Sequence, residues 1–301
     1  MPAYGENERE SLILARSIRK FAGAYSNYPI WVMLPNGQLN QDIRYALNIQ
    51  DAQLIPFEIA PEVLGFPFAG KILAAAAAEE LADGLADTLV WMDSDTILVG
   101  EPDQLNLREG NYLGYRPVML KLIGSSCDQP IDAFWELVYR HCSVSMDNLF
   151  PMKTVVDEVE IRPYFNAGLL AVHPARGLLQ AWRENFLRLY MLKEFQGFYQ
   201  VHVLYRIFIH QAILAGTVLS WLGPGELYEL SPDYNFSIQL IDQTAVGGCP
   251  LCLNDLVTCR YDEFERLASP VWRKFIRVEA PLLEWLDEQL GQSIDRSSQA
   301  C

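Results

Sequence analysis

The sequence is short of positive charge. Its 301 residues include 23 Lys and Arg against 38 Asp and Glu, and the formal net charge is -15. A nucleic-acid-binding surface needs basic side chains for phosphate contacts, and an anionic membrane surface attracts the same side chains. The composition therefore argues against both partners, although one metal ion could still bring a nucleotide to an acidic pocket.

The sequence also lacks long apolar runs and a signal peptide. No run of about 18 uninterrupted apolar residues occurs, which is the length that a membrane-spanning helix needs. The first ten residues are polar and acidic, whereas a signal peptide begins with basic residues. We therefore expect no membrane span and a cytoplasmic location.

Cysteine is scarce as well. Six cysteines in 301 residues are too few and too scattered for a disulfide framework. Cys249, Cys252 and Cys259 lie close together, but a zinc site needs a fourth ligand and no His follows residue 210. We expect reduced, partly buried thiols rather than a zinc site.

What is present is the composition of a globular domain, 50% hydrophobic and 20% charged. Apolar residues at helical spacing predict helices at residues 14–25, 69–83, 178–189 and 204–214. Short apolar runs predict strands at residues 30–34, 88–92, 111–115, 168–172 and 217–222. Strands that are apolar on both faces and alternate with helices predict an α/β fold with a mostly parallel sheet. We expect a single domain over 1–301, with a core over 1–240 and a C-terminal appendage over 241–301.

The sharpest motif is Asp93-Ser94-Asp95, directly after the apolar strand at 88–92. Two carboxylates at the end of a buried strand are costly unless something offsets their charge. Residues two apart in an extended chain face the same side, here toward the crevice where open α/β sheets bind ligands. Two oxygen donors suit Mg²⁺ or Mn²⁺ that bridges to a pyrophosphate, and the alternative is a solvated turn in which Asp95 caps the backbone. Because the two charges repel, Asp95→Asn is predicted to raise stability without metal.

The strand that ends in Asp-x-Asp resembles the metal motif of glycosyltransferases with the GT-A fold. Residues 164–170 contain Phe-Asn-Ala-Gly and resemble a stretch of glycosyltransferase family 8, the glycogenin-like group. His210 and Gln211 stand where that family has an Asp-Gln-Asp segment, and the three blocks keep the family's order over 11–240. The resemblance implies a GT-A α/β/α sandwich, a nucleotide-diphosphate-sugar donor, an unknown acceptor, bound Mn²⁺ or Mg²⁺, and retention of anomeric configuration.

The resemblance also implies site residues. Asp95 would bind the metal directly, and Asp93 would bind the ribose or a second metal position. Asn166 and Gly168 would face the donor sugar, since an amide can bind hydroxyl groups and a glycine lets a ligand come close. The alternative is a structural Asn in a strand that contains a glycine.

Further candidates come from the residues around these blocks. Gln211 could orient the reacting anomeric carbon. Its neighbour His210 is a second catalytic candidate, and it could equally be a hydrogen-bonded core histidine. Lys71 could reach a donor phosphate or be a solvated surface lysine. Arg116 could contact donor or acceptor. Asn235, in the segment 234–236, could line the acceptor pocket or belong to the core.

The chain departs from the family in three places. The late His-x-x-Gly-x-x-Lys-Pro-Trp segment is absent, and His210 replaces an acidic residue. We also expect the first strand of a GT-A chain to be missing, because residues 1–5 resemble the loop that follows such a strand. The third metal ligand would then be a water or one of three carboxylates, those of Asp233, Asp242 and Asp255.

The sequence therefore predicts a metal-dependent, retaining glycosyltransferase. The alternative from another class is a GT-A fold that binds a nucleotide sugar or a partner without turnover. A phosphatase of the haloacid-dehalogenase type also uses Asp-x-Asp on a strand, but its motif continues Gly-Thr where this chain has Thr96-Ile97. A sugar nucleotidyltransferase would need a glycine-rich phosphate loop near the start of the chain, and none is present.

Overall fold

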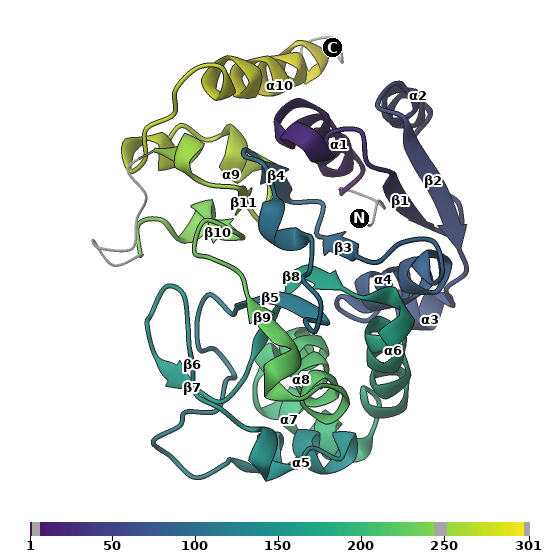
Figure 1. Ribbon diagram of the computed structural model, residues 1–301, viewed down its shortest axis with the longest axis vertical. Helices are drawn as coiled ribbons and strands as arrows, with labels where there is room; N and C mark the ends of the chain where they lie inside the picture. Colours follow the sequence, from purple (N-terminus) through teal and green to yellow (C-terminus); the bar gives the residue numbers. More distant parts are fainter. Residues whose placement is uncertain (2–6, 244–251, 298–301) are drawn as a thin grey trace.

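The computed structural model describes residue 1 and residues 7–243 and 252–297, with side chains described as far as residue 291. Its strands form four small sheets within an α/β fold (Figure 1). The central sheet has the order β3 (Leu89–Met92), β8 (Phe165–Val172), β5 (Leu113–Pro117) and β9 (Leu227–Glu229). The other sheets pair β1 (Ile30–Pro35) with β2 (Ala52–Phe57), β6 (Met152–Lys153) with β7 (Glu160–Ile161), and β10 (Phe236–Ser237) with β11 (Thr258–Arg260) and then β4 (Thr96–Leu98).

The helices fall at the two ends of the molecule and beside the sheet (Figure 1). One end holds α1 (Asn7–Phe21) and α10 (Leu282–Ser297), and the opposite end holds α5 (Ala133–Cys142), α7 (Lys193–Val201) and α8 (Val203–Trp221). Packed against each other beside the sheet are α4 (Ala69–Ala82) and α6 (Leu178–Leu189). The remaining helices are α2 (Gln41–Ile49), α3 (Pro61–Leu64) and α9 (Phe264–Ala268).

The α/β class and the predicted helices 69–83 and 178–189 are confirmed, but the sheet is not mostly parallel. β8 runs antiparallel to both β3 and β5, while β5 and β9 are parallel, as are β1 and β2. All eight residues of β8 are buried. An apolar run indicates that both faces of a strand are buried, but it does not indicate the direction of the strand. The sequence pattern therefore could not distinguish a mixed sheet from a parallel one. The sandwich detail stays a prediction.

The predicted strand at 217–222 is wrong, because α8 continues as one helix to Trp221. Residues 209–219 are all buried, so the helix has no polar face to mark its period. Gly216 sits in this helix where it meets α5, and a Cβ there would lie 2.7 Å from Cys142 Sγ. A close helix contact, rather than a break, explains the glycine.

α8 is long and apolar enough to cross a membrane by length and composition, and it is the one such helix in the described part of the chain. Inside the protein, 61% of its most apolar 18-residue window is buried. It packs against α5, α6, α7 and β8. These contacts are those of a core helix.

The C-terminal residues are joined to the core by strand pairing. β11 pairs antiparallel with β4, with Arg260 opposite Thr96, and parallel with β10. A single sheet thus spans the boundary expected at residue 240. β11, which lies beyond that boundary, therefore contributes directly to the surroundings of the Asp93–Asp95 motif.

Residue 1 lies along β1. The Met1 amino group donates to Trp31 O at 3.0 Å, and Met33 N donates to Met1 O at 2.8 Å, in the pattern of a parallel ladder. Residues 2–5 of the predicted N-terminal loop lie outside the described residues.

Glu79 of α4 makes stability depend on pH. Its side chain is fully buried, and its Oε2 accepts from Gln180 N at 2.8 Å in the first turn of α6. Burial raises the pKa of Glu79 to about 7, against the opposing hydrogen bonds from Gln180, Leu179 and Leu178. Between its ordinary pKa of 4.5 and about 7, the native state binds more protons here than the unfolded state does. Stability is therefore lost as pH rises through this window.

We expect Glu79→Gln to remove this part of the pH dependence. Compared with wild type, the variant should gain stability from pH 5 to pH 8, by roughly 1–3 kcal/mol. Urea unfolding at several pH values measures the difference, with Glu80→Gln as control because Glu80 is exposed and pairs only loosely with Arg183 at 3.8 Å. Parallel stability profiles for wild type and Glu79→Gln would contradict this account.

Candidate functional site

The Asp93–Asp95 motif lies where the sequence places it, at the carboxyl end of β3. Asp93 N donates to Gly168 O at 2.8 Å, which continues the pairing of β3 and β8 by one residue. Tyr261 N donates to Asp95 O at 3.0 Å and ties the motif to the residue after β11. Both aspartates are buried, at 6% and 7% exposure. Two buried carboxylates require counter-charges.

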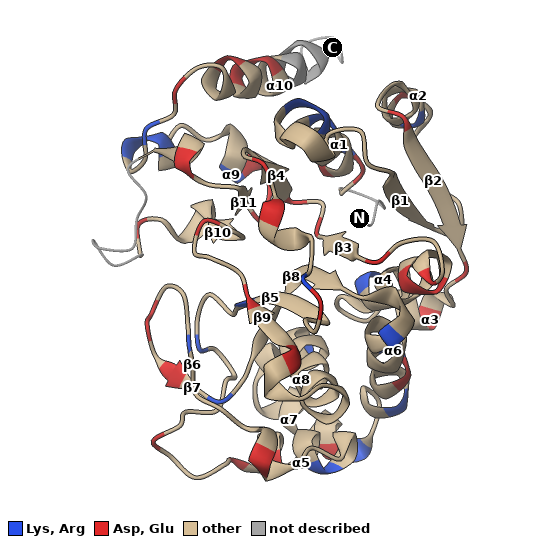
Figure 2. Ribbon diagram, in the orientation of Figure 1, with Lys and Arg blue, Asp and Glu red and all other residues tan. Residues whose placement is uncertain are grey.

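Two basic side chains supply those charges. Lys71 Nζ of α4 lies 2.6 Å from Asp93 Oδ2. Arg260 of β11 donates from Nη2 to Asp95 Oδ2 at 2.5 Å and from Nε to Asp95 Oδ1 at 3.3 Å, and its Nη2 lies 3.5 Å from Asp93 Oδ2. The four side chains form a cluster, here called the charge cluster, with a formal charge of zero. Elsewhere on the ribbon acidic and basic residues are scattered without a basic face (Figure 2).

The ion pairs dominate the protonation of Arg260. Burial lowers the pKa of its guanidinium, but the carboxylates of Asp95 and Asp93 outweigh burial and hold that pKa above the ordinary arginine value. Burial is also the largest influence on the pKa of Asp95 and raises it, while Arg260 opposes the rise. Arg260 is therefore a permanent cation beside the motif.

Asn166 and Gly168 of β8 adjoin the charge cluster. Asn166 Oδ1 accepts from Gly168 N at 2.8 Å. A Cβ on Gly168 would lie 2.8 Å from Arg260 Nη1 and 3.0 Å from Asp93 Oδ2. Gly168 thus leaves room for the charged side chains of Arg260 and Asp93. The sequence analysis instead predicted that this glycine lets a ligand come close.

His210 and Gln211 of α8 reach the same region. Gln211 Oε1 accepts from Ala167 N at 3.0 Å, between Asn166 and Gly168. His210 Nδ1 donates to Ile207 O at 2.8 Å, which leaves Nε2 as the acceptor nitrogen. Burial first, and then the charge of Lys71, lowers the pKa of His210 well below its ordinary value. Both side chains therefore present neutral groups.

Phe68 joins His210 to the charge cluster. Its ring centroid lies 4.4 Å from that of His210 and 4.8 Å from Lys71 Nζ. Phe68 directly precedes α4 and has a positive φ of 60°, which is strained for a residue with a Cβ. The structure thus gathers Lys71, Asp93, Asp95, Asn166, Gly168, His210 and Gln211.

Arg116 and Asn235 do not join them. Arg116 Nη1 donates to Leu230 O at 2.6 Å and pairs with Glu229 at 3.3 Å, which ties β5 to the end of β9. Asn235 N donates to Thr258 Oγ1 at 2.7 Å. Within the described residues neither side chain bonds to the charge cluster, so the predicted contacts of both with donor or acceptor gain no support from the geometry.

Sequence reasoning missed Arg260 and Glu10. Glu10 of α1 is buried, and burial followed by the charge of Asp95 raises its pKa to about 8, so it stands as a neutral acid near Asp95. Arg260 follows the apolar segment 256–259, and an arginine in such a setting is seldom buried without a partner. That signal marks an ion pair but does not identify the partner.

The charge cluster does not fit a divalent cation as it stands. Asp93 Oδ2 and both oxygens of Asp95 already bind cations, and Asp93 Oδ1 alone lacks a partner in the described chain. Among described residues no group of three His, Cys, Asp or Glu side chains could hold a metal, so the predicted third ligands Asp233, Asp242 and Asp255 do not complete a site. A divalent ion on Asp95 would also face the Arg260 guanidinium at close range.

The cysteine cluster is only partly described. Cys252 and Cys259 are buried free thiols, and burial raises the pKa of Cys259. Cys249 lies outside the described residues, so the prediction on zinc stays a prediction.

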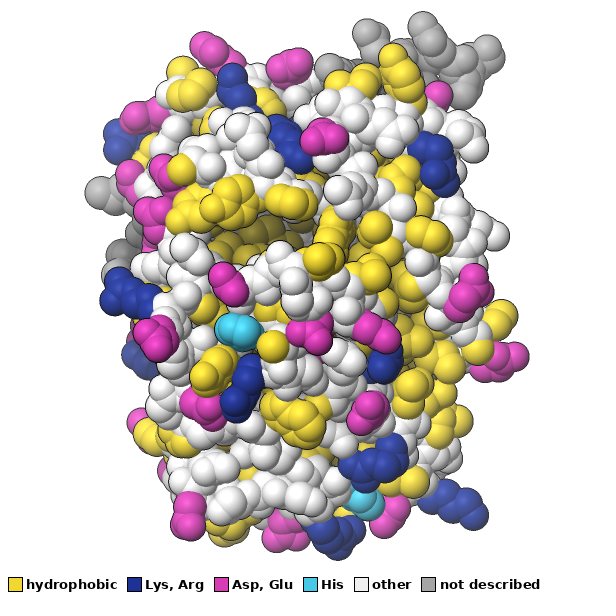
Figure 3. Space-filling view, turned by 45° about the vertical axis from the view of Figure 1, so that its right-hand side comes forward, with side chains coloured by type: hydrophobic (Ala, Val, Ile, Leu, Met, Phe, Trp, Pro, Cys, Tyr) yellow, Lys and Arg dark blue, Asp and Glu magenta, His cyan; other side chains and the backbone are white. Residues whose placement is uncertain are grey.

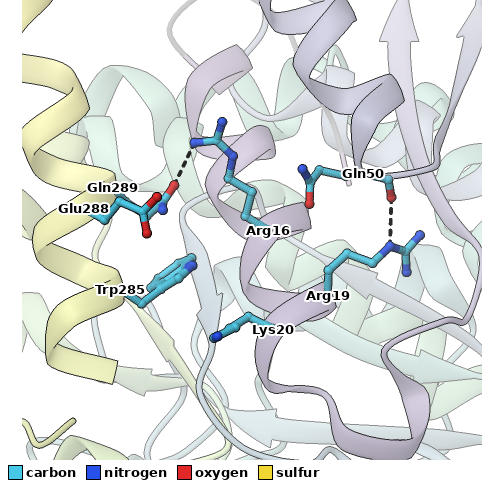
Figure 4. Close-up of a pocket in the computed structure, with 7 residues that line it drawn as sticks. All are labelled: Arg16, Arg19, Lys20, Gln50, Trp285, Glu288 and Gln289. Atoms are coloured by element: carbon cyan, nitrogen blue, oxygen red, sulfur yellow. Dashed lines mark hydrogen bonds between the residues drawn. The ribbon is translucent and has the colours of Figure 1, made fainter. Parts of the chain in front are cut away.

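A separate cavity of about 370 Å³ lies between α1 and α10 (Figure 4). Its lining is Arg16, Arg19, Lys20, Gln50, Trp285, Glu288 and Gln289. Arg19 donates to four backbone carbonyls, those of Gln50, Ser26, Tyr28 and Asp51. None of the predicted site residues lines this cavity. In the view of Figure 3, hydrophobic side chains gather in a hollow with charged residues of both signs around it.

Comparison with known families decides the class of protein. A model of the Rhodobacterales glycosyltransferase domain matches residues 3–197, about two thirds of the chain. The chain belongs to this glycosyltransferase family. It is therefore an enzyme that transfers sugars. The segment of this glycosyltransferase that the family model matches contains Lys71, the Asp pair, Asn166 and Gly168, and it ends before α8 and β11.

Solved glycosyltransferase structures are similar to this chain only at a distance. Mouse xyloside xylosyltransferase 1 in its apo form is 12% identical with a TM-score of 0.46, over 86% of this chain and 93% of that one. GlyE from Streptococcus pneumoniae TIGR4 is 14% identical with a TM-score of 0.47, over 98% and 62%. Core-mannan synthase A from Aspergillus fumigatus, in a Mn/GDP form, is 6% identical with a TM-score of 0.47, over 76% and 71%. No curated protein sequence matches the chain. Membership of family 8 stays a prediction.

Proposed function

We propose that this glycosyltransferase has the GT-A fold and takes its sugar from a nucleoside-diphosphate sugar bound at the charge cluster. The observation that carries the proposal is a set of four charged side chains at the carboxyl end of β3: Lys71, Asp93 and Asp95, which are buried, and Arg260, whose side chain is 17% exposed. Ligands of open α/β sheets bind at such strand ends. Removing four charged groups from water costs free energy. Charged groups enclosed in this way are found most often at functional sites.

The groups beside the charge cluster suit a sugar. Asn166 and Gln211 are uncharged amides that can hydrogen-bond hydroxyl groups. His210 stays neutral because burial and Lys71 lower its pKa. Hydroxyl groups can form hydrogen bonds with such neutral donors and acceptors, whereas the charged diphosphate is attracted to cations. The two kinds of group meet here around Gly168.

We further propose that transfer retains the anomeric configuration. An inverting transfer needs a free carboxylate as general base. Asp93 and Asp95 are held in ion pairs, and Glu10 is protonated near neutral pH because its pKa is about 8. The amide of Gln211 can instead orient the donor sugar without accepting a proton. The acceptor is left open.

The charge cluster does not fit the Mn²⁺ or Mg²⁺ that the sequence predicts, because its carboxylates already bind Lys71 and Arg260. In the proposed site Lys71 and Arg260 donate to the diphosphate, while Asp93 and Asp95 hold those two cations in position. Departure of the nucleoside diphosphate places charge on its oxygens, and fixed cations stabilise that charge without reorganisation.

A donor panel tests the proposal. Purified protein is incubated with nucleoside-diphosphate sugars, and released nucleoside diphosphate is measured for wild type, Asp93→Asn and Arg176→Met. We expect release from at least one donor, with a fall of about 100-fold in Asp93→Asn because Lys71 loses its partner. Arg176→Met removes a 3.0 Å ion pair with Glu226 away from the charge cluster and should leave release unchanged.

Two results would count against the proposal. Release that is equal in wild type and folded Asp93→Asn would remove the charge cluster from the site. Binding of a nucleotide sugar with no release and no transfer would favour the alternative of a binding protein without turnover.

A further inference from the structure

We infer that Arg260 and Lys71 take the place of a divalent cation, so that the chain binds its donor diphosphate without metal. The inference rests on the proposed donor site. The Asp-x-Asp motif predicts a bound metal ion, but in the folded chain its two carboxylates contact Lys71 and Arg260 instead.

Arg260 is held at the motif by its backbone. Arg260 pairs with Thr96, the residue after Asp95, and Tyr261 N donates to Asp95 O at 3.0 Å. Backbone contacts thus join β11 to the chain around Asp95, next to the ion pair between Arg260 and Asp95. The Arg260 side chain is 17% exposed, so it is enclosed rather than folded in from the surface.

The surroundings also leave room for the guanidinium. A Cβ on Gly168 would lie 2.8 Å from Arg260 Nη1, so any other residue at this position would push Arg260 away. Lys71 approaches from α4 on the Asp93 side, at 2.6 Å. Three separate elements, β11, β8 and α4, therefore shape one site for two cations on two carboxylates.

The cations keep donors for a ligand. Arg260 uses Nε and Nη2 on the carboxylates, and in the described chain Nη1 donates to neither of them. Lys71 has three N–H groups, and Asp93 takes one. Phosphate oxygens accept hydrogen bonds from groups of this kind, and arginine matches their geometry with two parallel bonds. The carboxylates then position the cations that a diphosphate contacts.

Mn²⁺ binding tests the inference without catalysis. Electron paramagnetic resonance measures free Mn²⁺ titrated with wild type, Arg260→Met, Arg260→Lys and the control Arg176→Met. We expect wild type, Arg260→Lys and the control to leave all of the Mn²⁺ free, and Arg260→Met to bind it in a 1:1 ratio. Tight binding by wild type that is lost in Asp95→Asn would overturn the inference.

Nucleotide affinity provides a second test that needs only wild type. UDP and GDP are titrated by calorimetry in chelator and in Mn²⁺, because the base is unassigned. Equal affinity in both conditions is expected, and an affinity at least tenfold higher with Mn²⁺ would overturn the inference even if Arg260→Met fails to fold. A chain that binds neither nucleotide in either condition would instead refute the proposed donor site, and the Mn²⁺ titration would still decide whether Arg260 occupies the cation position.

Discussion

Arg260→Met is expected to destabilise the fold by about 3–5 kcal/mol, because the two buried carboxylates keep the ion pair with Lys71 but lose the one with Arg260. The melting temperature should fall by roughly 10 °C for a chain of this size. The effect comes from uncompensated charge rather than from lost packing, so removing one carboxylate as well should restore part of the stability. Arg260→Met combined with Asp95→Asn is therefore expected to be more stable than Arg260→Met alone.

Urea unfolding of wild type, both single variants and the double variant measures the interaction free energy between Arg260 and Asp95. Asp95→Asn alone should lower stability by about 1–3 kcal/mol, because a charged hydrogen bond to Arg260 is lost. This reverses the sign expected from the sequence, where the motif was two like charges without a known partner. Arg176→Met, which breaks a partly exposed pair, should cost no more than about 1 kcal/mol. Additive losses in the double variant would show that Arg260 and Asp95 are not coupled.

Lys71→Met is expected to weaken nucleoside diphosphate binding by about 10- to 100-fold, the usual worth of one charged hydrogen bond. Lys71 is 7% exposed and has one carboxylate partner, so its remaining N–H groups are directed by Asp93 rather than by solvent. Lys71→Arg keeps the charge and should lose less affinity.

Calorimetric titration of UDP and GDP in chelator measures this loss. Lys20→Met is the matched control, because Lys20 lines the cavity between α1 and α10 and not the charge cluster. An affinity that falls in Lys20→Met and not in Lys71→Met would move the diphosphate to that cavity.

The part of the site that could be predicted from the sequence is the part made by local patterns. Asp93 and Asp95 follow an apolar strand, Lys71 opens an alanine-rich helix, and Asn166 and Gly168 lie in a buried strand. Each pattern fixes a residue relative to its own element. Because sequential α/β elements bring their ends together, these residues also meet in space.

The partner of Asp95 could not be predicted in this way. Arg260 lies 165 residues from Asp95 in the chain, and the contact depends on the pairing of β11 with β4. Neither strand is longer than three residues, so neither has an apolar pattern that specifies its neighbour. The antiparallel direction of β8 could not be predicted for a related reason. Every residue of β8 is buried, and such an apolar pattern is the same for a parallel and an antiparallel strand.

A crystal structure of the chain with a bound nucleoside diphosphate, grown in chelator, tests the central claim most directly. The account predicts diphosphate oxygens within hydrogen-bond distance of Lys71 Nζ and Arg260 Nη1, at the carboxyl end of β3. A diphosphate bound between α1 and α10 against Lys20, with no contact to the charge cluster, would contradict it.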